Sequence, residues 1–214
     1  MKGYLDLTIY AKYIKRAIDL FVSLVFLLLF WWIYAFLALI IRFKLGSPVL
    51  FAQDRPGKGG KIFRLYKFRS MSNAKDKDGN LLPDKERLNR FGKLLRSTSL
   101  DELPELLNVL KGDMSLIGPR PLLVKYLDYY NSFERRRHNV RPGLTGLAQI
   151  SGRNAATWKA RFQKDIEYVD NVSLSLDIKI FFATIKKIFV REGIEYKNDS
   201  TINDYFESAD RLTA

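Results

Sequence analysis

The sequence predicts an α+β protein that is mainly helical and carries a membrane helix near its N-terminus. Three observations predict this class. The stretch from Leu20 to Ile41 contains no charged residue, two short strand-like segments flank a glycine-rich turn, and apolar residues recur at helical spacing towards the C-terminus. The 214 residues are enough for one domain of ordinary size and an additional segment.

The uncharged stretch is predicted to be a membrane anchor. As a helix, Leu20 to Ile41 would be about 33 Å long at about 1.5 Å per residue, which matches the hydrocarbon thickness of a bilayer. A signal peptide is disfavoured because the stretch is too long and no small-residue cleavage site precedes the basic Arg42 and Lys44. A buried core helix is disfavoured because helices that are apolar all round are rare in domains of this size.

The topology of the anchor is not decided by its length. Lys12, Lys15 and Arg16 flank its N-terminal end, and Arg42 and Lys44 flank its C-terminal end. The positive-inside rule therefore favours a helix that enters and leaves on the same membrane face, whereas length alone favours a straight span. We expect a bend, because a straight span would leave three basic residues on the far side.

Short strands and helices are predicted after the anchor. The segments Pro48–Phe51 and Lys61–Phe68 flank the turn-rich DRPGKGG and predict a β-hairpin. The polar segment Ser72–Asp84 predicts a loop, and a basic helix is predicted over Lys85–Arg96. One face of this helix would carry Leu88, Phe91, Leu94 and Leu95.

A basic amphipathic helix is predicted near the C-terminus. Its apolar stripe consists of Ile178, Phe181, Phe182, Ile185, Ile188 and Phe189. The stripe would either lie on an anionic membrane surface or cover the core, and both alternatives remain open. The polar residues that follow predict a loosely ordered tail.

The amino-acid composition limits the ligands and metal sites that the protein could have. The formal net charge of +13 predicts attraction to polyanions, whether nucleic acid, anionic lipid or a phosphorylated substrate. The chain has no cysteine and only one histidine, His138, which excludes thiolate and multi-histidine metal sites. A metal would have to be a hard cation held by carboxylates and substrate oxygens, which favours magnesium.

Two adjacent acids, Asp101 and Glu102, lie within the basic segment RSTSLDELPELLNVLKGDMSLIGPRP. Phosphoryl transfer needs a nucleophile, a divalent cation and cationic side chains, and carboxylates can supply the first and hold the second. The spacing from Ser99 to Glu102 also fits a capping box. Pro104 weakens that alternative, because a helix begun at Leu100 would need the N–H that proline lacks. If the helix begins at Pro104 instead, the acids lie at its positive N-terminus.

Cationic candidates for binding phosphate are Lys67, Arg96 and Arg120, of which the arginines offer a bidentate fork. Pro119 and Pro121 restrict the backbone around Arg120 and could present its guanidinium with little entropy loss; an ordinary proline turn with a solvated arginine is the alternative. The later RPGLTG turn has two glycines that would allow a ligand to approach the backbone, although short glycine patterns are weak evidence.

These motifs resemble those of the bacterial sugar transferases, also called monotopic phosphoglycosyl transferases, and of their smallest members in particular. The similarity runs from Lys15 to about Arg191. It is carried, in order, by KRAIDL, YKFRSM, RSTSLDELPELLNVLKGDMSLIGPRPL, VRPGLTGLAQISGRN and LSLDIKI. Several motifs in the same order across most of the chain make a chance similarity improbable.

The resemblance implies a two-step reaction at the cytoplasmic face of the bacterial inner membrane, with Mg²⁺, a UDP-sugar and a polyprenyl phosphate such as undecaprenyl phosphate. It implies that Asp101 attacks the sugar-bearing phosphate, expels UMP and carries a covalent phosphosugar, which the lipid phosphate then takes. Glu102 would assist through the metal or through protons, so both acids are candidate metal ligands. Lys67, Arg96 and Arg120 match family positions linked to the substrate phosphates.

The sequence departs from the family at the anchor, where a Ser-Pro pair commonly breaks the helix and Trp31-Trp32 stands here. The resemblance to the small members, including GRNAATW, favours an acetamido sugar such as diacetylated bacillosamine, with galactose or glucose next. The expected organisation is a membrane anchor at 1–44, a catalytic domain with interfacial helices at 45–192 and a polar tail at 193–214. A membrane-tethered nucleic-acid-binding protein or a scaffold would also fit the charge.

Overall fold

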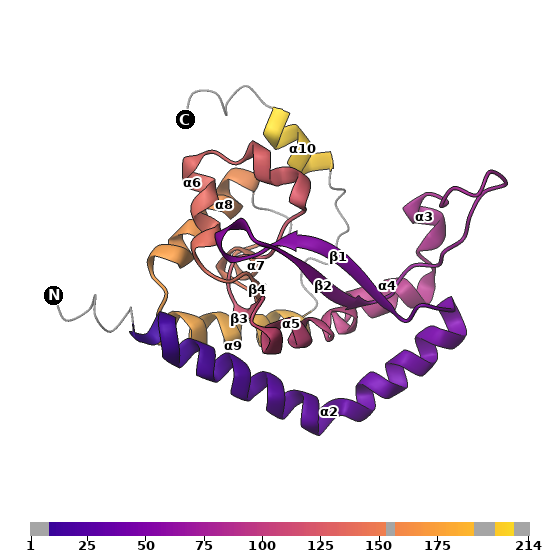
Figure 1. Cartoon of the computed structure of the whole chain (residues 1–214), viewed down its shortest axis with the longest axis horizontal. Coiled ribbons are helices and arrows are strands. Elements are labelled where there is room, and N and C mark those ends of the chain that lie inside the picture. The colour runs from indigo at the N-terminus through magenta and orange to yellow at the C-terminus, as the bar shows by residue number, and fades with distance from the viewer. Residues whose placement is uncertain (1–8, 153–156, 191–199, 208–214) are drawn as a thin grey trace.

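The N-terminal helix bends in its middle. The structure is a computed structural model that describes residues 9–152, 157–190 and 200–207. A π-helical turn, η1 (Tyr10–Ile14), continues into α2 (Lys15–Leu45), and together they are long and apolar enough to cross a membrane by length and composition. Phe30 leaves helical geometry at φ −115° and ψ 17°, and Figure 1 shows α2 as two arms of an open V. The expected bend therefore occurs, one residue before Trp31-Trp32.

The bend has a local stabilising contact in place of a proline. The indole Nε1 of Trp32 donates a hydrogen bond to the Leu29 carbonyl at 3.1 Å. Kinks expose carbonyls that a straight helix would satisfy internally, so a nearby side-chain donor lowers the cost of bending. The rings of Phe26 and Phe30 also pack with their centroids 4.7 Å apart.

The N-terminal arm of α2 is fixed to the rest of the domain by polar contacts. Arg16 donates to the carbonyls of Val109 and Leu110, at 2.6 and 3.1 Å, where helix α5 (Glu105–Lys111) ends. Asp19, which is buried, accepts a hydrogen bond from the Leu116 N–H at 3.0 Å. A cationic side chain at the C-terminus of α5 complements its negative end.

The C-terminal arm of α2 contacts the same domain. The Tyr34 hydroxyl donates to the Leu103 carbonyl at 3.0 Å. Arg69 donates to the carbonyl of Leu45, the last residue of the helix, and to that of Ser47 just after it. An apolar cluster beneath this arm contains Leu37, Ile41, Phe68 and Leu95. Both ends of the long helix are therefore held by one domain, which lies in the opening of the V (Figure 1).

Two small sheets support the site. Strands β1 (Leu50–Pro56) and β2 (Ile62–Phe68) form the predicted antiparallel hairpin around the turn η2 (Lys58–Gly60), although β1 continues well beyond Phe51. The second sheet pairs β3 (Ser115–Ile117) with β4 (Gly143–Thr145) in parallel and was not predicted.

The predicted helix over Lys85–Arg96 is wrong as a single element. It is divided into α3 (Asp84–Arg87) and α4 (Arg90–Ser97), because the Asn89 side chain accepts a hydrogen bond from Gly92 N at 2.9 Å and caps α4. The predicted single apolar face is also wrong: Leu95 is 2% exposed, whereas Leu94 is 59% exposed.

The remaining helices surround the sheets. They are η3 (Leu100–Glu102), η4 (Val124–Tyr129), α6 (Ser132–Arg135), η5 (Arg136–Asn139), α7 (Leu147–Ile150), α8 (Trp158–Asp170), α9 (Leu174–Val190) and α10 (Ser200–Glu207). The prediction of a mainly helical α+β protein with a long N-terminal apolar helix is confirmed. The polar tail is not loosely ordered throughout, because α10 buries Ile202 and Phe206 against Tyr126, Tyr130 and Phe162.

Helix α9 confirms the predicted C-terminal helix. Its buried side is formed by Ile180 and Asp177, whereas Ile178, Phe181 and Phe182 from the predicted apolar stripe are exposed. Ile185 is half-buried, and the side chains of Ile188 and Phe189 lie outside the described ones. Three of the four described residues of the stripe are therefore exposed rather than packed on the core. Residues 193–199 and 208–214 of the tail lie outside the described residues.

Candidate active site

Asp101 and Glu102 lie in a turn that comes directly before a helix. Helix α5 begins at Glu105 with Pro104 as its N-cap residue, and the acids occupy the 3₁₀ turn η3 just before it. The capping box at Ser99 is wrong, because Ser99 has a left-handed backbone with φ 57° and its side chain caps nothing. The acids therefore lie at the positive end of a short helix, where anionic groups are favoured.

Glu102 is held by two cations that come from different elements. Lys67 of β2 places Nζ 2.7 Å from Glu102 Oε1. Arg120, in the loop after β3, donates Nη2 to Oε1 and Nη1 to Oε2, the latter at 3.3 Å. Burial alone would raise the pKa of Glu102, but the charges and hydrogen bonds of Arg120 and Lys67 outweigh it and hold the pKa well below its usual range. Glu102 is therefore ionised at neutral pH.

Asp101 has a different environment from its neighbour. No hydrogen bond or ion pair to the Asp101 carboxylate is found in the described part of the chain, and the residue is only 8% exposed. Burial and the adjacent charge of Glu102 raise the pKa of Asp101 to about 6, against the opposing charges of Lys67, Arg96 and Arg120. A carboxylate without donors and with raised basicity is suited to act as a nucleophile.

A third acid, Glu105, completes the cluster and was missed by sequence reasoning. It is 1% exposed, and its Oε1 lies 3.1 Å from Lys67 Nζ. Burial and the charge of Glu102 raise the pKa of Glu105 to about 7, although Lys67 opposes the shift. The three-residue spacing between Glu102 and Glu105, which places two side chains on one side of a helical turn, was the signal that could have found it.

The structure brings four of the five predicted site residues into direct or adjacent contact. Arg96 is the fifth: its Nε donates to Ser70 Oγ at 2.7 Å, and its charge lowers the pKa of Asp101. The solvated-arginine alternative for Arg120 is wrong, because its guanidinium binds Glu102. Residues 153–156 of the GRNAATW stretch lie outside the described residues.

The glycines of the RPGLTG turn have a packing role beside the second sheet. A Cβ atom on Gly143 would lie 2.0 Å from Gly118 N, and one on Gly146 would lie 2.2 Å from Gly118 O. Strands β3 and β4 can approach only because these positions have no side chain. Close packing therefore accounts for both glycines without a ligand.

The capacity of the site for a metal is limited. Among the described residues, no group of three or more His, Asp or Glu side chains is placed to hold a metal ion. Asp101 offers an unpaired carboxylate, whereas both oxygens of Glu102 accept hydrogen bonds from cations. Magnesium usually keeps several waters and takes one or two protein carboxylates together with substrate phosphates, so the residues fit a shared site of this kind.

The structure thus combines a bent apolar helix, long enough to cross a membrane by length and composition, with a cluster of acids held by cations in a chain of net charge +13. The chain belongs to the bacterial sugar transferase family, whose model matches residues 10–191.

Three relatives illustrate the family. The chain is 51% identical to EpsL of Bacillus subtilis, an uncharacterized sugar transferase, over 92% of this chain and 98% of that protein. It is 42% identical to the galactosyl transferase CpsE of Streptococcus agalactiae, over 84% of this chain and 43% of CpsE. It is 40% identical to an Aeromonas hydrophila UDP-N-acetylgalactosamine-undecaprenyl-phosphate N-acetylgalactosaminephosphotransferase, over 86% of this chain and 45% of the relative. The chain thus spans less than half the length of the latter two.

Proposed function

We propose that this protein transfers a sugar 1-phosphate from a UDP-sugar to undecaprenyl phosphate and releases UMP. The observation that carries the proposal is the difference between the contacts of two adjacent acids. The Asp101 carboxylate has no partner in the described residues, whereas Glu102 binds two cations. Membership of the bacterial sugar transferase family and the activity for which the Aeromonas relative is named support it. They favour a transferase over a nucleic-acid-binding protein or a scaffold.

The reaction proceeds in two displacements. A carboxylate oxygen of Asp101 attacks the phosphorus that bears the sugar, the bond to the bridging oxygen breaks, and UMP leaves with that oxygen. The lipid phosphate then attacks the same phosphorus, Asp101 is released as a carboxylate, and a polyprenyl diphosphate sugar is formed. Lys67 and Arg120 supply positive charge to the phosphate oxygens, while Glu102 keeps both cations in place between turnovers.

We assign Asp101, and Glu102 if one of its cations moves to the substrate, as the protein ligands of Mg²⁺. When bound, the ion would neutralise phosphate oxygens of the UDP-sugar. Lys67, Arg96 and Arg120 would contribute the remaining positive charge. Glu105 is too deeply buried to reach the substrate and acts on Lys67.

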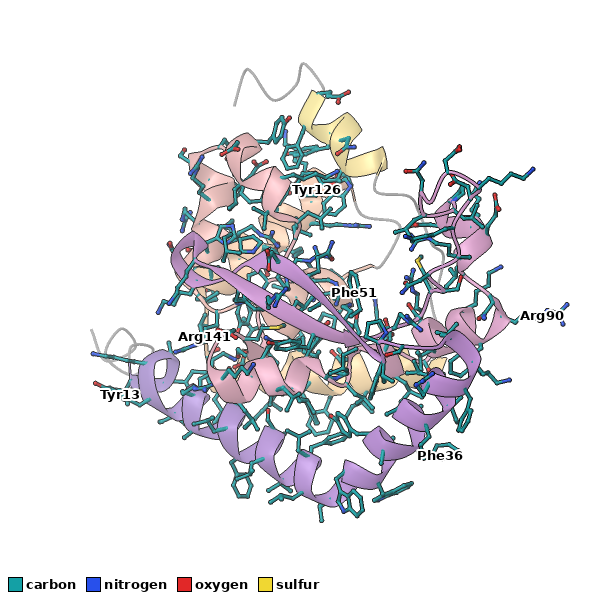
Figure 2. The ribbon with its side chains drawn as sticks, turned by 45° about the vertical axis from the view of Figure 1, so that its right-hand side comes forward. Tyr13, Phe36, Phe51, Arg90, Tyr126 and Arg141 are labelled. Atoms are coloured by element: carbon teal, nitrogen blue, oxygen red, sulfur yellow. The ribbon has the colours of Figure 1, made fainter. Side chains whose placement is uncertain are left out.

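The proposed location is the cytoplasmic face of the bacterial inner membrane, with α2 entering and leaving on that face. Three observations support the returning topology: the bend at Phe30, the contacts of both arms with one domain, and basic residues at both ends. Figure 2 shows Tyr13 and Phe36 on the outer sides of the two arms, where 61% and 59% of each residue is exposed. The exposed apolar residues of α9 would rest at the interface.

The sugar is proposed by class only. Two of the relatives named above carry a sugar in their names, galactose for CpsE and N-acetylgalactosamine for the Aeromonas protein, and the expectation of diacetylated bacillosamine rests on the GRNAATW resemblance alone. An acetamido sugar agrees with the Aeromonas relative and with that resemblance, whereas galactose agrees with CpsE. Specificity of this kind depends on the side chains that contact the sugar.

The experiment that tests the function is UMP release by the detergent-solubilised full chain with Mg²⁺ and undecaprenyl phosphate, across a panel of UDP-sugars. The proposal expects one or two UDP-sugars to support turnover, and chelation of Mg²⁺ to abolish it. A protein that only binds nucleic acid or recruits other enzymes would release no UMP with any member of the panel.

A further inference from the structure

The loop that carries Arg120 is held along its backbone at every residue. Four hydrogen bonds fix four consecutive positions. They are Gly118 N to Thr145 O at 2.8 Å, Gly143 N to Pro119 O at 3.0 Å, Arg137 Nη2 to Arg120 O at 2.7 Å, and Arg55 Nη1 to Pro121 O at 3.2 Å. The first two are backbone bonds from the residues just after β3 to Thr145 and Gly143 of β4, whereas the last two come from arginine side chains.

The two prolines explain why side chains are needed. Pro119 and Pro121 have no N–H, so the segment offers mainly carbonyl acceptors and cannot continue as a strand. A donor must reach each carbonyl from another element, and an arginine side chain can supply several donors in a fixed plane. Arg137 therefore holds the carbonyl of the residue whose guanidinium binds Glu102.

The guanidinium of Arg137 is held by hydrogen bonds at each of its nitrogens. The residue is buried, and its Nε and Nη2 donate to Asp165 Oδ2 of α8 at 3.1 and 2.7 Å. Its Nη1 donates to the Tyr130 hydroxyl at 3.1 Å. The charge of Arg137 is thus neutralised by Asp165, and all three nitrogens of its guanidinium have acceptors. Such a group acts as a rigid support, because it can rotate only by losing several buried hydrogen bonds.

We propose that Arg137 is a positioning residue for the transferase reaction, which acts by fixing the backbone of Arg120 so that its guanidinium stays at Glu102 and the substrate phosphates. This inference rests on the proposed function. Arg137 does not contact Glu102 in any interaction found here, so its effect on the rate must pass through Arg120.

The test is a double-mutant cycle on UMP release in the full chain, with Arg137→Lys and Arg120→Lys alone and together. Lysine keeps the positive charge opposite Asp165 but cannot bridge Asp165, Tyr130 and the Arg120 carbonyl at once. Arg137→Lys should lower the rate about tenfold. In the Arg120→Lys background, Arg137→Lys should lower the rate less than about twofold, because the effects of two substitutions that act through one group are not additive.

The matched control is Arg136→Lys, the same change at the neighbouring residue, whose guanidinium pairs with Asp170 on the surface. It should leave the rate within about twofold of wild type. A rate for Arg137→Lys equal to that of the control, or a full tenfold loss also in the Arg120→Lys background, would overturn the positioning role. If Arg137→Lys does not fold, Tyr130→Phe, which removes one hydrogen bond to Arg137, is measured in the same cycle with the same criteria. A wild-type protein that releases no UMP would refute the proposed function instead.

Discussion

Lys67 Nζ lies 2.7 Å from Glu102 Oε1 and so joins strand β2 to the turn that carries the acids, although the two residues are 35 positions apart. The same nitrogen lies 3.1 Å from Glu105 Oε1. One ammonium group therefore neutralises part of a cluster of buried acids. Under the proposed function, the cations that bind the substrate phosphates are paired with Glu102 before the substrate arrives, and the substrate must compete with this carboxylate for them.

Glu102→Gln tests this competition. The variant keeps the size of the side chain but no longer attracts Lys67 and Arg120 as an anion, so the two cations should bind a UDP-sugar at least as tightly as before. Their positions would be less well defined, and any metal contact through Glu102 would be weakened. We expect KM for the UDP-sugar to stay equal or fall, and kcat to fall at least about tenfold. Steady-state UMP release measures both; a wild-type kcat would remove Glu102 from the mechanism.

The pH dependence of the first displacement follows from the environment of Asp101. Its pKa is raised to about 6 by burial and by the charge of Glu102, and the nucleophile is the ionised form. The rate should therefore fall as the pH falls through about 6, to roughly a tenth of its plateau at pH 5. Rapid-quench measurement of UMP formation in the absence of lipid acceptor gives this profile. In Glu102→Gln the midpoint should move to lower pH, and an unchanged midpoint would contradict the assigned cause.

Glu105→Gln should change how stability depends on pH. The pKa of Glu105 is raised to about 7 in the folded protein, so between about pH 4.5 and 7 the folded state binds a proton that the unfolded state has lost. This contribution makes the wild type lose stability as the pH rises through that window, and glutamine removes it. The melting temperature of the variant minus that of wild type should therefore increase from pH 5 to pH 8. A constant difference would show that Glu105 does not titrate there.

The returning anchor can be tested by cysteine labelling, because the natural chain has no cysteine. Tyr13→Cys and Phe43→Cys place thiols near the two ends of the long helix, at residues that are 61% and 84% exposed. Neither thiol should react with a membrane-impermeant maleimide added to intact cells, and both should react after permeabilisation. Labelling of Tyr13→Cys from outside the intact cell would establish a straight span.

Local signals predicted much of the fold and little of its tertiary arrangement. The uncharged run, the hairpin and α9 follow from hydrophobic pattern and turn residues, which act over a few positions. The position of the bend does not follow from such local signals. Phe30 is neither proline nor glycine, and the bend is stabilised by the Trp32 indole. The division of the basic helix depends on one cap, Asn89, within an otherwise continuous helical pattern.

The pairing within the candidate site was not predicted. Composition and spacing did not distinguish Asp101 from Glu102, and only the family resemblance gave them different roles. The folded surroundings supply a physical difference, because the Asp101 carboxylate has no partner in the described residues and Glu102 holds Lys67 and Arg120. The support from Arg137 could not be read from the sequence, because it depends on buried contacts between elements that are distant along the chain.

The most direct test of Asp101 as the covalent nucleophile is the mass of the intact protein after incubation with its preferred UDP-sugar and Mg²⁺ in the absence of lipid acceptor. Wild type should gain the mass of one sugar phosphoryl group, which is the mass of the UDP-sugar minus that of UMP. Peptide mapping should locate this group on Asp101, with one equivalent of UMP released. Asp101→Asn should gain no mass. A wild-type protein that turns over with no adduct under rapid quenching, or an Asp101→Asn variant that forms one, would contradict Asp101 as the covalent nucleophile.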